Sequence, residues 1–389
     1  MGYTHPNPLP KGEGENVWRL VTDDNVSASF GLAADETLAQ RVGLGLSQPT
    51  LRLYTYRSHC ALVGRFQNVE NEVRLEYCRE NGIAINRRPT GGGAIIMGAD
   101  QLGVALTIQG RGDDSYSHAR ELMSHFSEGL VRGLNQLGVQ AGFRRKNDIE
   151  VDSKKLVGLG IYRTPSGGLL FHASLLVDLD IALMLSVLNT PFEKISDKEI
   201  DTVAGRITTV RRETESRISM DEVRRVIADG FVSAFDVNLI PSDFTTDECG
   251  EIAGLETEKY LSDDWVHQTT SVPDSNGSAK IKTDAGMIDV SVTMAGSTIK
   301  AAFIGGDFFA SESAVADLEA SLRWHAGQTN KVAATIGKIF ESRGGEFGGI
   351  QPEVMVEAVM KAVGRARVVE SQMRADPYGC YVNPGGVHV

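Results

Sequence analysis

Hydrophobic and polar residues recur along the chain at two spacings, which predict a mixture of strands and helices. Residues 51–56 alternate between apolar and polar side chains, as a half-buried strand does. Residues 116–137 place leucines three or four apart and are followed by Gly138, which predicts an amphipathic helix with a glycine stop. The same reasoning predicts further strands at residues 17–21, 61–63, 83–86, 94–97, 102–108, 148–151, 156–162 and 169–177, and helices at residues 29–42, 73–80, 181–188 and 220–235.

These predicted elements divide into two structured parts. The first part mixes strands and helices around one sheet, and a polar stretch that includes Pro273 to Ser278 follows it. Strands at residues 279–283, 287–294 and 298–304 and helices at residues 313–324, 332–340 and 352–363 form the second part. We therefore expect a flexible leader at residues 1–16, a larger domain at 17–245, a linker at 246–278, a small accessory domain at 279–370 and a tail at 371–389.

Composition narrows the class of protein. The 389 residues are 41% hydrophobic and 23% charged, as in soluble globular proteins, and the net charge is -12. This acidic balance argues against non-specific binding to nucleic acid or to a membrane surface. We expect no signal peptide and no membrane span, and the four cysteines are too scattered to suggest a disulfide framework or a zinc site. A cytoplasmic location fits these features best.

Residues 87–94 combine positive charge with an unusually free main chain. Arg87 and Arg88 come shortly before Thr90 and the three glycines Gly91 to Gly93, which Ala94 follows. Glycines let a bound group approach the backbone, whose N–H groups can face an anion, and arginine side chains suit phosphate or carboxylate. On this stretch alone, a flexible turn beside two solvated arginines explains the pattern at least as well.

Seven short motifs follow one another along the first 210 residues. They are Val63-Gly64-Arg65-Phe66-Gln67-Asn68, Arg87 to Ala94, Asn147-Asp148, Lys155-Leu156-Val157-Gly158, His172-Ala173-Ser174-Leu175-Leu176, Pro191 to Ile195 and Arg206-Ile207-Thr208. Taken in order, they resemble the lipoate-protein ligase branch of the biotin/lipoate ligase family. The resemblance implies an α/β (α+β) fold in which helices flank a mixed sheet, like that of class II aminoacyl-tRNA synthetases, with residues 17–245 as the catalytic domain. Residues 279–363 resemble the small accessory domain of the long ligases.

This resemblance implies a reaction in two steps. ATP and lipoate, or octanoate, would give an acyl-adenylate, whose carbonyl a lysine of a lipoyl carrier protein or lipoyl domain would attack. Lys155 would offset negative charge at the α-phosphate and the acyl carboxylate, and Arg87 would hold the adenylate or the carboxylate. Asp148 would meet Mg²⁺. The predicted binding residues also include Thr90, Gly91, Gly92, Gly93, Ala94, Asn147, Gly158, His172 and Ser174.

Several of these residues also have a purely structural explanation. Lys155 is adjacent to Lys154 in a polar turn, Asn147 and Asp148 suit a surface turn, and His172 suits a core strand. The chain also departs from the family after the glycines, since Met97-Gly98 stands where the ligases usually have His-Asp, and Asp100-Gln101 stands where they have Gly-Asn. This departure weakens any inference about acyl-chain specificity.

Two other functions remain open. A cysteine-dependent octanoyl or lipoyl transferase of the same fold needs an activated thiol beside the acyl pocket, and Cys60 is the candidate because no cysteine lies between residues 79 and 248. A non-catalytic homologue that binds an acyl carrier would keep the fold without turnover. Biotin ligase is disfavoured, because Gly110-Arg111-Gly112-Asp113 resembles its basic loop only superficially.

Overall fold

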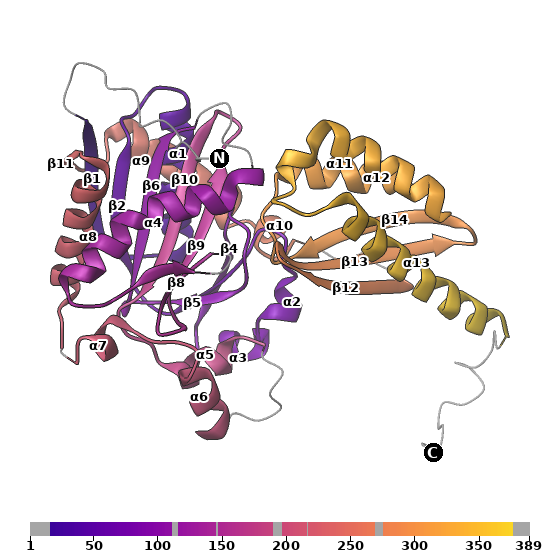
Figure 1. Ribbon diagram of the computed structural model, residues 1–389, viewed down its shortest axis with the longest axis horizontal. Helices are drawn as coiled ribbons and strands as arrows, with labels where there is room; N and C mark the ends of the chain where they lie inside the picture. The colour runs from indigo at the N-terminus through magenta and orange to yellow at the C-terminus, as the bar shows by residue number, and fades with distance from the viewer. Residues whose placement is uncertain are drawn as a thin grey trace, which may run out of the picture.

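The computed structural model describes residues 16–110, 116–144, 147–189, 197–215, 217–268 and 275–375. The expected leader except Asn16, the motif from Pro191 to Ile195 and the tail beyond residue 375 lie outside the described residues. Within them, the chain forms a large sheet, a small sheet and a C-terminal sheet (Figure 1). The strands of the large sheet are β1 (Val17–Val26), β2 (Thr50–Tyr56), β6 (Gln101–Gln109), β7 (Gly142–Arg144), β8 (Asp148–Val151), β9 (Lys154–Arg163), β10 (Gly168–Leu176) and β11 (Asn238–Pro241).

The large sheet is mixed, with strand order β11-β1-β2-β6-β10-β9-β8-β7. β1 runs parallel to both of its neighbours, and the other pairs are antiparallel. Six of its strands were predicted from the hydrophobic pattern, whereas the short edge strands β7 and β11 were not. The helices that contribute to its core clusters are α1 (Ala28–Gly43), α4 (Ala119–Gln136), α7 (Val210–Glu213), α8 (Met220–Phe235) and α9 (Thr246–Leu255). The helices α5 (Ile181–Val187), α6 (Asp197–Ala204) and α10 (Asp263–Val266) contact the small sheet or its neighbours instead.

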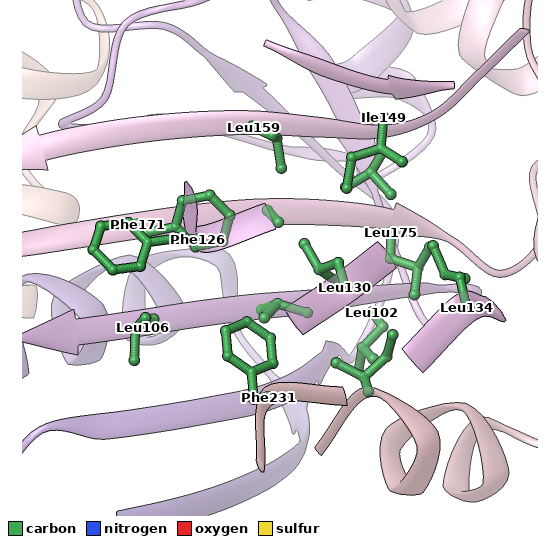
Figure 2. Close-up of a cluster of buried hydrophobic side chains, with 14 of the residues drawn as sticks. Leu102, Leu106, Phe126, Leu130, Leu134, Ile149, Leu159, Phe171, Leu175 and Phe231 are labelled. Atoms are coloured by element: carbon green, nitrogen blue, oxygen red, sulfur yellow. The ribbon is translucent and has the colours of Figure 1, made fainter. Parts of the chain in front are cut away.

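One face of the large sheet packs against α4 and α8. Figure 2 shows leucines and phenylalanines of β6 and β10 facing the apolar side chains of α4. The two helices approach closely because glycines lie where they cross: a Cβ atom at Gly230 would come 2.2 Å from the carbonyl oxygen of Gly129. This layer forms the main core of the large sheet.

The opposite face is covered by α1 and α9. Buried residues of α1 pack on Tyr54 and Tyr56 of β2 and on Leu170 of β10. Part of the range expected to be a linker forms α9, a single π-helical turn (Glu256–Tyr260) and α10. The start of α9 is capped, because Thr245 and Glu248 form a capping box.

A separate three-stranded sheet holds the arginine and glycine stretch, so the first part contains two sheets and not the single sheet expected. The central strand β3 pairs in parallel with β4 and antiparallel with β5. Because both edges of β3 are paired in this way, it is not free to join the large sheet. The elements here are α2 (Val69–Glu72), α3 (Leu75–Glu80), β3 (Cys60–Val63), β4 (Ala84–Arg87) and β5 (Ile95–Met97).

The C-terminal part is an antiparallel sheet with helices on one side (Figure 1). Apolar residues of its central strands and of all three long helices form one core cluster. None of the helices in the described ranges is long and apolar enough to cross a membrane. The elements are β12 (Gly277–Thr283), β13 (Gly286–Ala295), β14 (Thr298–Gly306), β15 (His325–Ala326), α11 (Glu312–Leu322), α12 (Thr329–Arg343) and α13 (Pro352–Ala375).

Candidate active site

A cavity of about 240 Å³ is lined by residues of the large sheet, the small sheet and the C-terminal part. Of the twelve residues predicted for the site, all but Arg87 and Asp148 line this cavity. The other lining residues were not among those predicted for the site. The complete lining is Tyr54, Tyr56, Leu62, Arg88, Thr90, Gly91, Gly92, Gly93, Ala94, Ile95, Met97, Asn147, Lys155, Gly158, Leu159, Gly160, His172, Ala173, Ser174 and Asp307.

Two glycines on β9 keep the sheet surface open along the cavity. Gly158 pairs with Ser174 on β10, and Gly160 pairs with His172. A Cβ atom at Gly160 would come 3.1 Å from the side chain of Thr90, and one at Gly158 would come 3.1 Å from Lys155 Nζ. Since successive same-side residues of a strand are about 7 Å apart, the two glycines leave room for an extended ligand.

Lys155 lies near the start of β9, and its side chain is 34% exposed. Its Nζ is 2.8 Å from Asp148 Oδ1 on the neighbouring strand β8. The backbone of Lys155 donates to the carbonyl of Arg206 and accepts from the N–H of Thr208, so the predicted Arg206–Thr208 motif holds this lysine in place. Lys154 precedes it in the strand and is not part of the cavity lining.

Gly91 and the neighbouring Gly64 are packed too tightly for side chains, whereas a Cβ atom at Gly93 would meet nothing within 4 Å. A Cβ atom at Gly91 would lie 2.2 Å from the carbonyl oxygen of Phe308, and one at Gly64 would lie 2.0 Å from that of Gly92. Gly92 also has a φ of +95°, which L-residues rarely adopt. The glycine stretch is therefore a fixed wall of the cavity, held from behind by the C-terminal part.

The two adjacent arginines hold backbone in place. Arg87 is fully buried and does not line the cavity, and burial lowers its pKa to about 10. The structure thus does not bring the Arg87 guanidinium to the ligand space, contrary to the expected role. Arg88 lines the cavity but also donates to main-chain carbonyls. The acceptors for Arg87 are the carbonyls of Gly64, Arg65, Gln67, Trp265 and Val266, and those for Arg88 are the carbonyls of Leu62, Gly91 and Gly93.

A buried polar network, which the sequence did not single out, lies beneath His172. His172 Nε2 is 2.8 Å from Tyr54 Oη and 3.1 Å from Asp35 Oδ2. Asp35 in turn accepts from Arg52 Nη1 at 2.7 Å. Burial opposes ionisation of Asp35, yet the charge of Arg52 holds the pKa of Asp35 below its ordinary value. The alternation of residues 51–56 predicted that Arg52 and Tyr54 lie on the polar side of a half-buried strand, whereas every residue of β2 is buried.

The described cysteines lie outside the cavity. Cys60 is buried in β3 and absent from the lining, and burial raises its pKa to about 12. Cys78 is also buried, and Cys249 is exposed on α9. A thiol so far from ionisation at neutral pH is a poor nucleophile, so Cys60 does not suit the role considered for it.

The expected magnesium ligand, Asp148, has an oxygen engaged with Lys155. Within the described ranges, no three side chains of His, Cys, Asp or Glu are grouped so that they would hold a metal ion. A carboxylate that pairs with a lysine in this way suits the positioning of that lysine. Any Mg²⁺ that arrives with a nucleotide would depend on the phosphate oxygens for most of its ligands.

A family model described as the lipoyl protein ligase A/B catalytic domain matches residues 27–232, which is more than half of the chain. The chain belongs to this family. The assignment agrees with the geometry, because the matched range contains every lining residue of the cavity except Asp307. It also confirms the resemblance drawn from the motifs. The chain is therefore an enzyme of the lipoate ligase and transferase family.

Individual relatives and structures agree with this assignment. Octanoyltransferase LipM of Kyrpidia tusciae is 30% identical over 274 residues, covering 65% of this chain and 99% of the relative. The bi-partite lipoate protein ligase of Thermoplasma acidophilum has a TM-score of 0.58 at 27% identity, covering 66% of this chain and 98% of that chain. A lipoate-protein ligase A bound with ATP has a TM-score of 0.56 at 26% identity, covering 65% and 99%. The mixed α/β fold is thus confirmed, and the C-terminal sheet with its helices is an additional domain.

Proposed function

We propose that this enzyme attaches an octanoyl or lipoyl group to a lysine of a lipoyl carrier domain. The observation that carries the proposal is a cavity with a largely buried interior and a lysine, Lys155, at its more exposed end. The names of similar proteins support it, since they include an octanoyltransferase and a lipoate protein ligase solved in a study with its E2 lipoyl domain.

The curated relatives favour an acyl donor that is already activated over the ATP-dependent activation expected from the sequence. In such a transfer, the amine of the carrier lysine attacks the acyl carbonyl, and negative charge develops on the carbonyl oxygen. Lys155 is suited to stabilise this charge. The bond between the acyl carbon and the activating group of the donor then breaks, and that group leaves with the proton that the amine loses. Because Cys60 is buried and does not line the cavity, we propose that the acyl group passes directly to the carrier lysine without an acyl-enzyme intermediate at Cys60.

A second candidate function, ATP-dependent acyl activation, is favoured by the polar groups at the same end of the cavity. Lys155 and Asn147 both line it, together with the glycine stretch, and none of the described cysteines does. Adenylation needs fixed positive charge and donors near the α-phosphate, which these groups offer, and needs no thiol. One similar ligase was solved with ATP.

Acylation assays on a purified E2 lipoyl domain separate these candidates. Wild type would be tested with an octanoyl-loaded acyl carrier without ATP, and with octanoate or lipoate plus Mg-ATP. Modification in the first assay supports the transferase, and modification with release of pyrophosphate in the second supports the ligase. We expect Lys155→Met to lose activity about a hundredfold or more, whereas Lys154→Met and Cys60→Ala retain it. No modification under either condition would contradict the proposal and favour a non-catalytic carrier-binding homologue.

A further inference from the structure

The C-terminal domain brings one carboxylate to the cavity. Among the described residues that line the cavity, Asp307, which directly follows β14, alone carries a carboxylate. The next residue, Phe308, packs behind the glycine stretch, because its carbonyl oxygen would lie 2.2 Å from a Cβ atom at Gly91. Asp307 Oδ1 accepts a hydrogen bond from the backbone N–H of Met287, which holds the side chain in place. The carboxylate is therefore a built part of the cavity wall.

Asp307 belongs to the part of the lining that is open to solvent. It is half-buried, as are Lys155 and Asn147, whereas the two lining tyrosines are fully buried. The C-terminal domain and the segment that leads into β8 meet over the glycine stretch. A Cβ atom at Gly92 would lie 3.7 Å from the ring of Phe309 and 3.9 Å from Asn147 Nδ2. A group that enters the cavity from a macromolecular partner can thus reach Asp307.

The negative charge of Asp307 forms no ion pair with another described residue. The cations of this region pair with other carboxylates, since Lys155 Nζ is 2.8 Å from Asp148 Oδ1 and Lys280 Nζ is 3.2 Å from Asp289 Oδ2. Charges attract and repel more strongly where burial reduces screening by water. A half-buried carboxylate without a cation therefore favours a positively charged group and repels phosphate and carboxylate.

The positively charged group in the proposed reaction is the carrier lysine, whose nitrogen must lose a proton before it can attack. At an ordinary pKa of about 10.4, only about one lysine in 2,500 is neutral at pH 7. A side chain that binds the ammonium and accepts its proton at the reacting position commonly accelerates such a step by about a hundredfold or more. The reaction therefore needs a base near the exposed end of the cavity.

The other titratable groups at the cavity suit this task less well. Lys155 and Arg88 are cations. His172 is buried, and its Nε2 lies 2.8 Å from Tyr54 Oη. Both lining tyrosines stay protonated at neutral pH, because burial raises the pKa of each of them. Asp148 is outside the lining and is engaged with Lys155.

We propose that Asp307 is a catalytic residue of acyl transfer, which binds the ε-ammonium of the carrier lysine and accepts its proton as the nitrogen attacks the acyl carbonyl. The proposal rests on the proposed function for its acyl donor and its carrier. The new bond joins the lysine nitrogen to the acyl carbon, and the bond from that carbon to the activating group breaks. The second proton that the nitrogen loses leaves with this group, and Asp307 then releases the first proton to water.

Hydroxylamine as an alternative acceptor tests this role, because it is largely uncharged at pH 7 and needs no base to become a nucleophile. The full chain would receive the donor that wild type uses, either octanoyl-loaded acyl carrier or octanoate with Mg-ATP. The acceptor would be a lipoyl domain or hydroxylamine, with rates measured above the enzyme-free background. We expect Asp307→Asn to lower kcat for the lipoyl domain about a hundredfold and to form octanoyl hydroxamate at close to the wild-type rate. Asparagine can still accept from the Met287 N–H, so the change removes only the charge.

The control is Asp284→Asn, because Asp284 is exposed in the turn before β13 and is not part of the lining. This variant should equal wild type with both acceptors. Asp148→Asn should slow both reactions alike, since it removes the charge that pairs with Lys155. If Asp307→Asn loses activity equally with both acceptors, or with neither, the proposal is wrong while the proposed function stands. If wild type acylates neither acceptor, the proposed function is wrong as well.

Discussion

At the residue scale, neighbouring residues of the same type have separate tasks. Lys155 and Lys154 are adjacent, yet only Lys155 lines the cavity. Arg87 and Arg88 are adjacent as well, and only Arg88 lines it. Successive side chains of an extended chain point to opposite faces, so the two side chains of each pair point in different directions. Arg87 is thereby left to bridge the loop at residues 64–67 and α10.

We therefore predict that Arg87→Met destabilises the protein without directly removing a ligand contact. The change leaves several buried carbonyls without a donor, and we expect the free energy of unfolding to fall by about 3 kcal/mol. Urea unfolding would measure it. Arg79→Met is the control, because 77% of that side chain is exposed. Normal stability combined with lost acyl binding would instead support the ligand-binding role inferred from the motif.

At the element scale, β9 shapes the cavity and α9 braces the sheet from behind. β9 carries Lys155 at one end, followed by the two glycines that keep its surface clear. The N-terminus of α9 is joined to β1 by Arg19, whose Nη1 lies 2.6 Å from Glu248 Oε1. The role of β9 in the cavity thus depends on Lys155 and the two glycines, and the attachment of α9 to β1 depends on the pair of Arg19 and Glu248.

For β9, we predict that Gly160→Ala weakens acyl binding with little effect on the fold. The added Cβ atom would come 3.1 Å from Thr90 and would narrow the space over the strand. We expect octanoate or lipoate to bind about tenfold more weakly in calorimetry. Gly254→Ala on α9 is the control, because its added atom meets nothing within 4 Å. Unchanged binding by Gly160→Ala would show that the acyl chain does not pass this position.

For α9, we predict a stability difference that depends on pH. Burial opposes ionisation of Glu248, yet hydrogen bonds from Arg19 and from the Thr245 N–H lower its pKa from 4.5 to about 2. A lowered pKa stabilises the fold above pH 4.5, and this contribution is lost as the pH falls towards 2. Glu248→Gln should thus reduce the free energy of unfolding by about 2 kcal/mol at pH 7.

This deficit should shrink by about half between pH 5 and pH 3, because wild type progressively loses the same charge. Urea unfolding at several pH values would measure it. Glu258→Gln provides the comparison, since Glu258 is exposed in the following helical turn. If the deficit in the free energy of unfolding stays constant across this pH range, the charge of the Glu248 carboxylate does not stabilise the fold, and only the shape of the side chain matters.

At the scale of the whole molecule, each of the two parts contributes a phenylalanine to the hydrophobic core of the other. Phe66 of the small sheet's loop belongs to the core of the C-terminal domain, and Phe309 of that domain belongs to the core of the large sheet. Phe66 also stacks on Phe308 with centroids 4.9 Å apart, and Arg65 pairs with Glu312 at 2.6 Å. Because Phe308 supports the glycine stretch and Asp307 lines the cavity, the C-terminal domain is part of the site.

We accordingly predict that Phe66→Ala weakens both stability and acyl binding. Loss of the buried ring should reduce the free energy of unfolding by about 3 kcal/mol, and the less supported glycine stretch should bind octanoate or lipoate more weakly. Thermal unfolding and calorimetry would measure the two effects. Phe340→Ala removes a ring stacked on Phe347 elsewhere in the C-terminal domain and should affect stability alone. If both variants leave binding unchanged, the C-terminal domain does not support the cavity.

The sequence by itself predicted most of the long elements and, with the family resemblance, half of the residues that line the cavity. The strands and helices with clear periodicity were predicted because periodicity is a local property of the chain, which burial on one face imposes. The glycine stretch was singled out because close backbone approach favours glycine, whereas Lys155 and Ser174 were predicted only through the resemblance to the family. The short edge strand β11 was missed because its pairing with β1 gives it its form. The helix α9 was missed although Thr245 and Glu248 form a capping box at its start, because its polar range was interpreted as a linker.

Only the tertiary structure decided which side chains share the cavity. Asp35, Arg52, Tyr54 and His172 come from α1, β2 and β10, and no local pattern links residues as far apart as 35 and 172. Long-range packing likewise separates Arg87 from the cavity and buries Cys60. It also brings Asp307 of the C-terminal domain to the cavity. Residue types specify which chemistry is available, whereas long-range packing determines which of those groups meet.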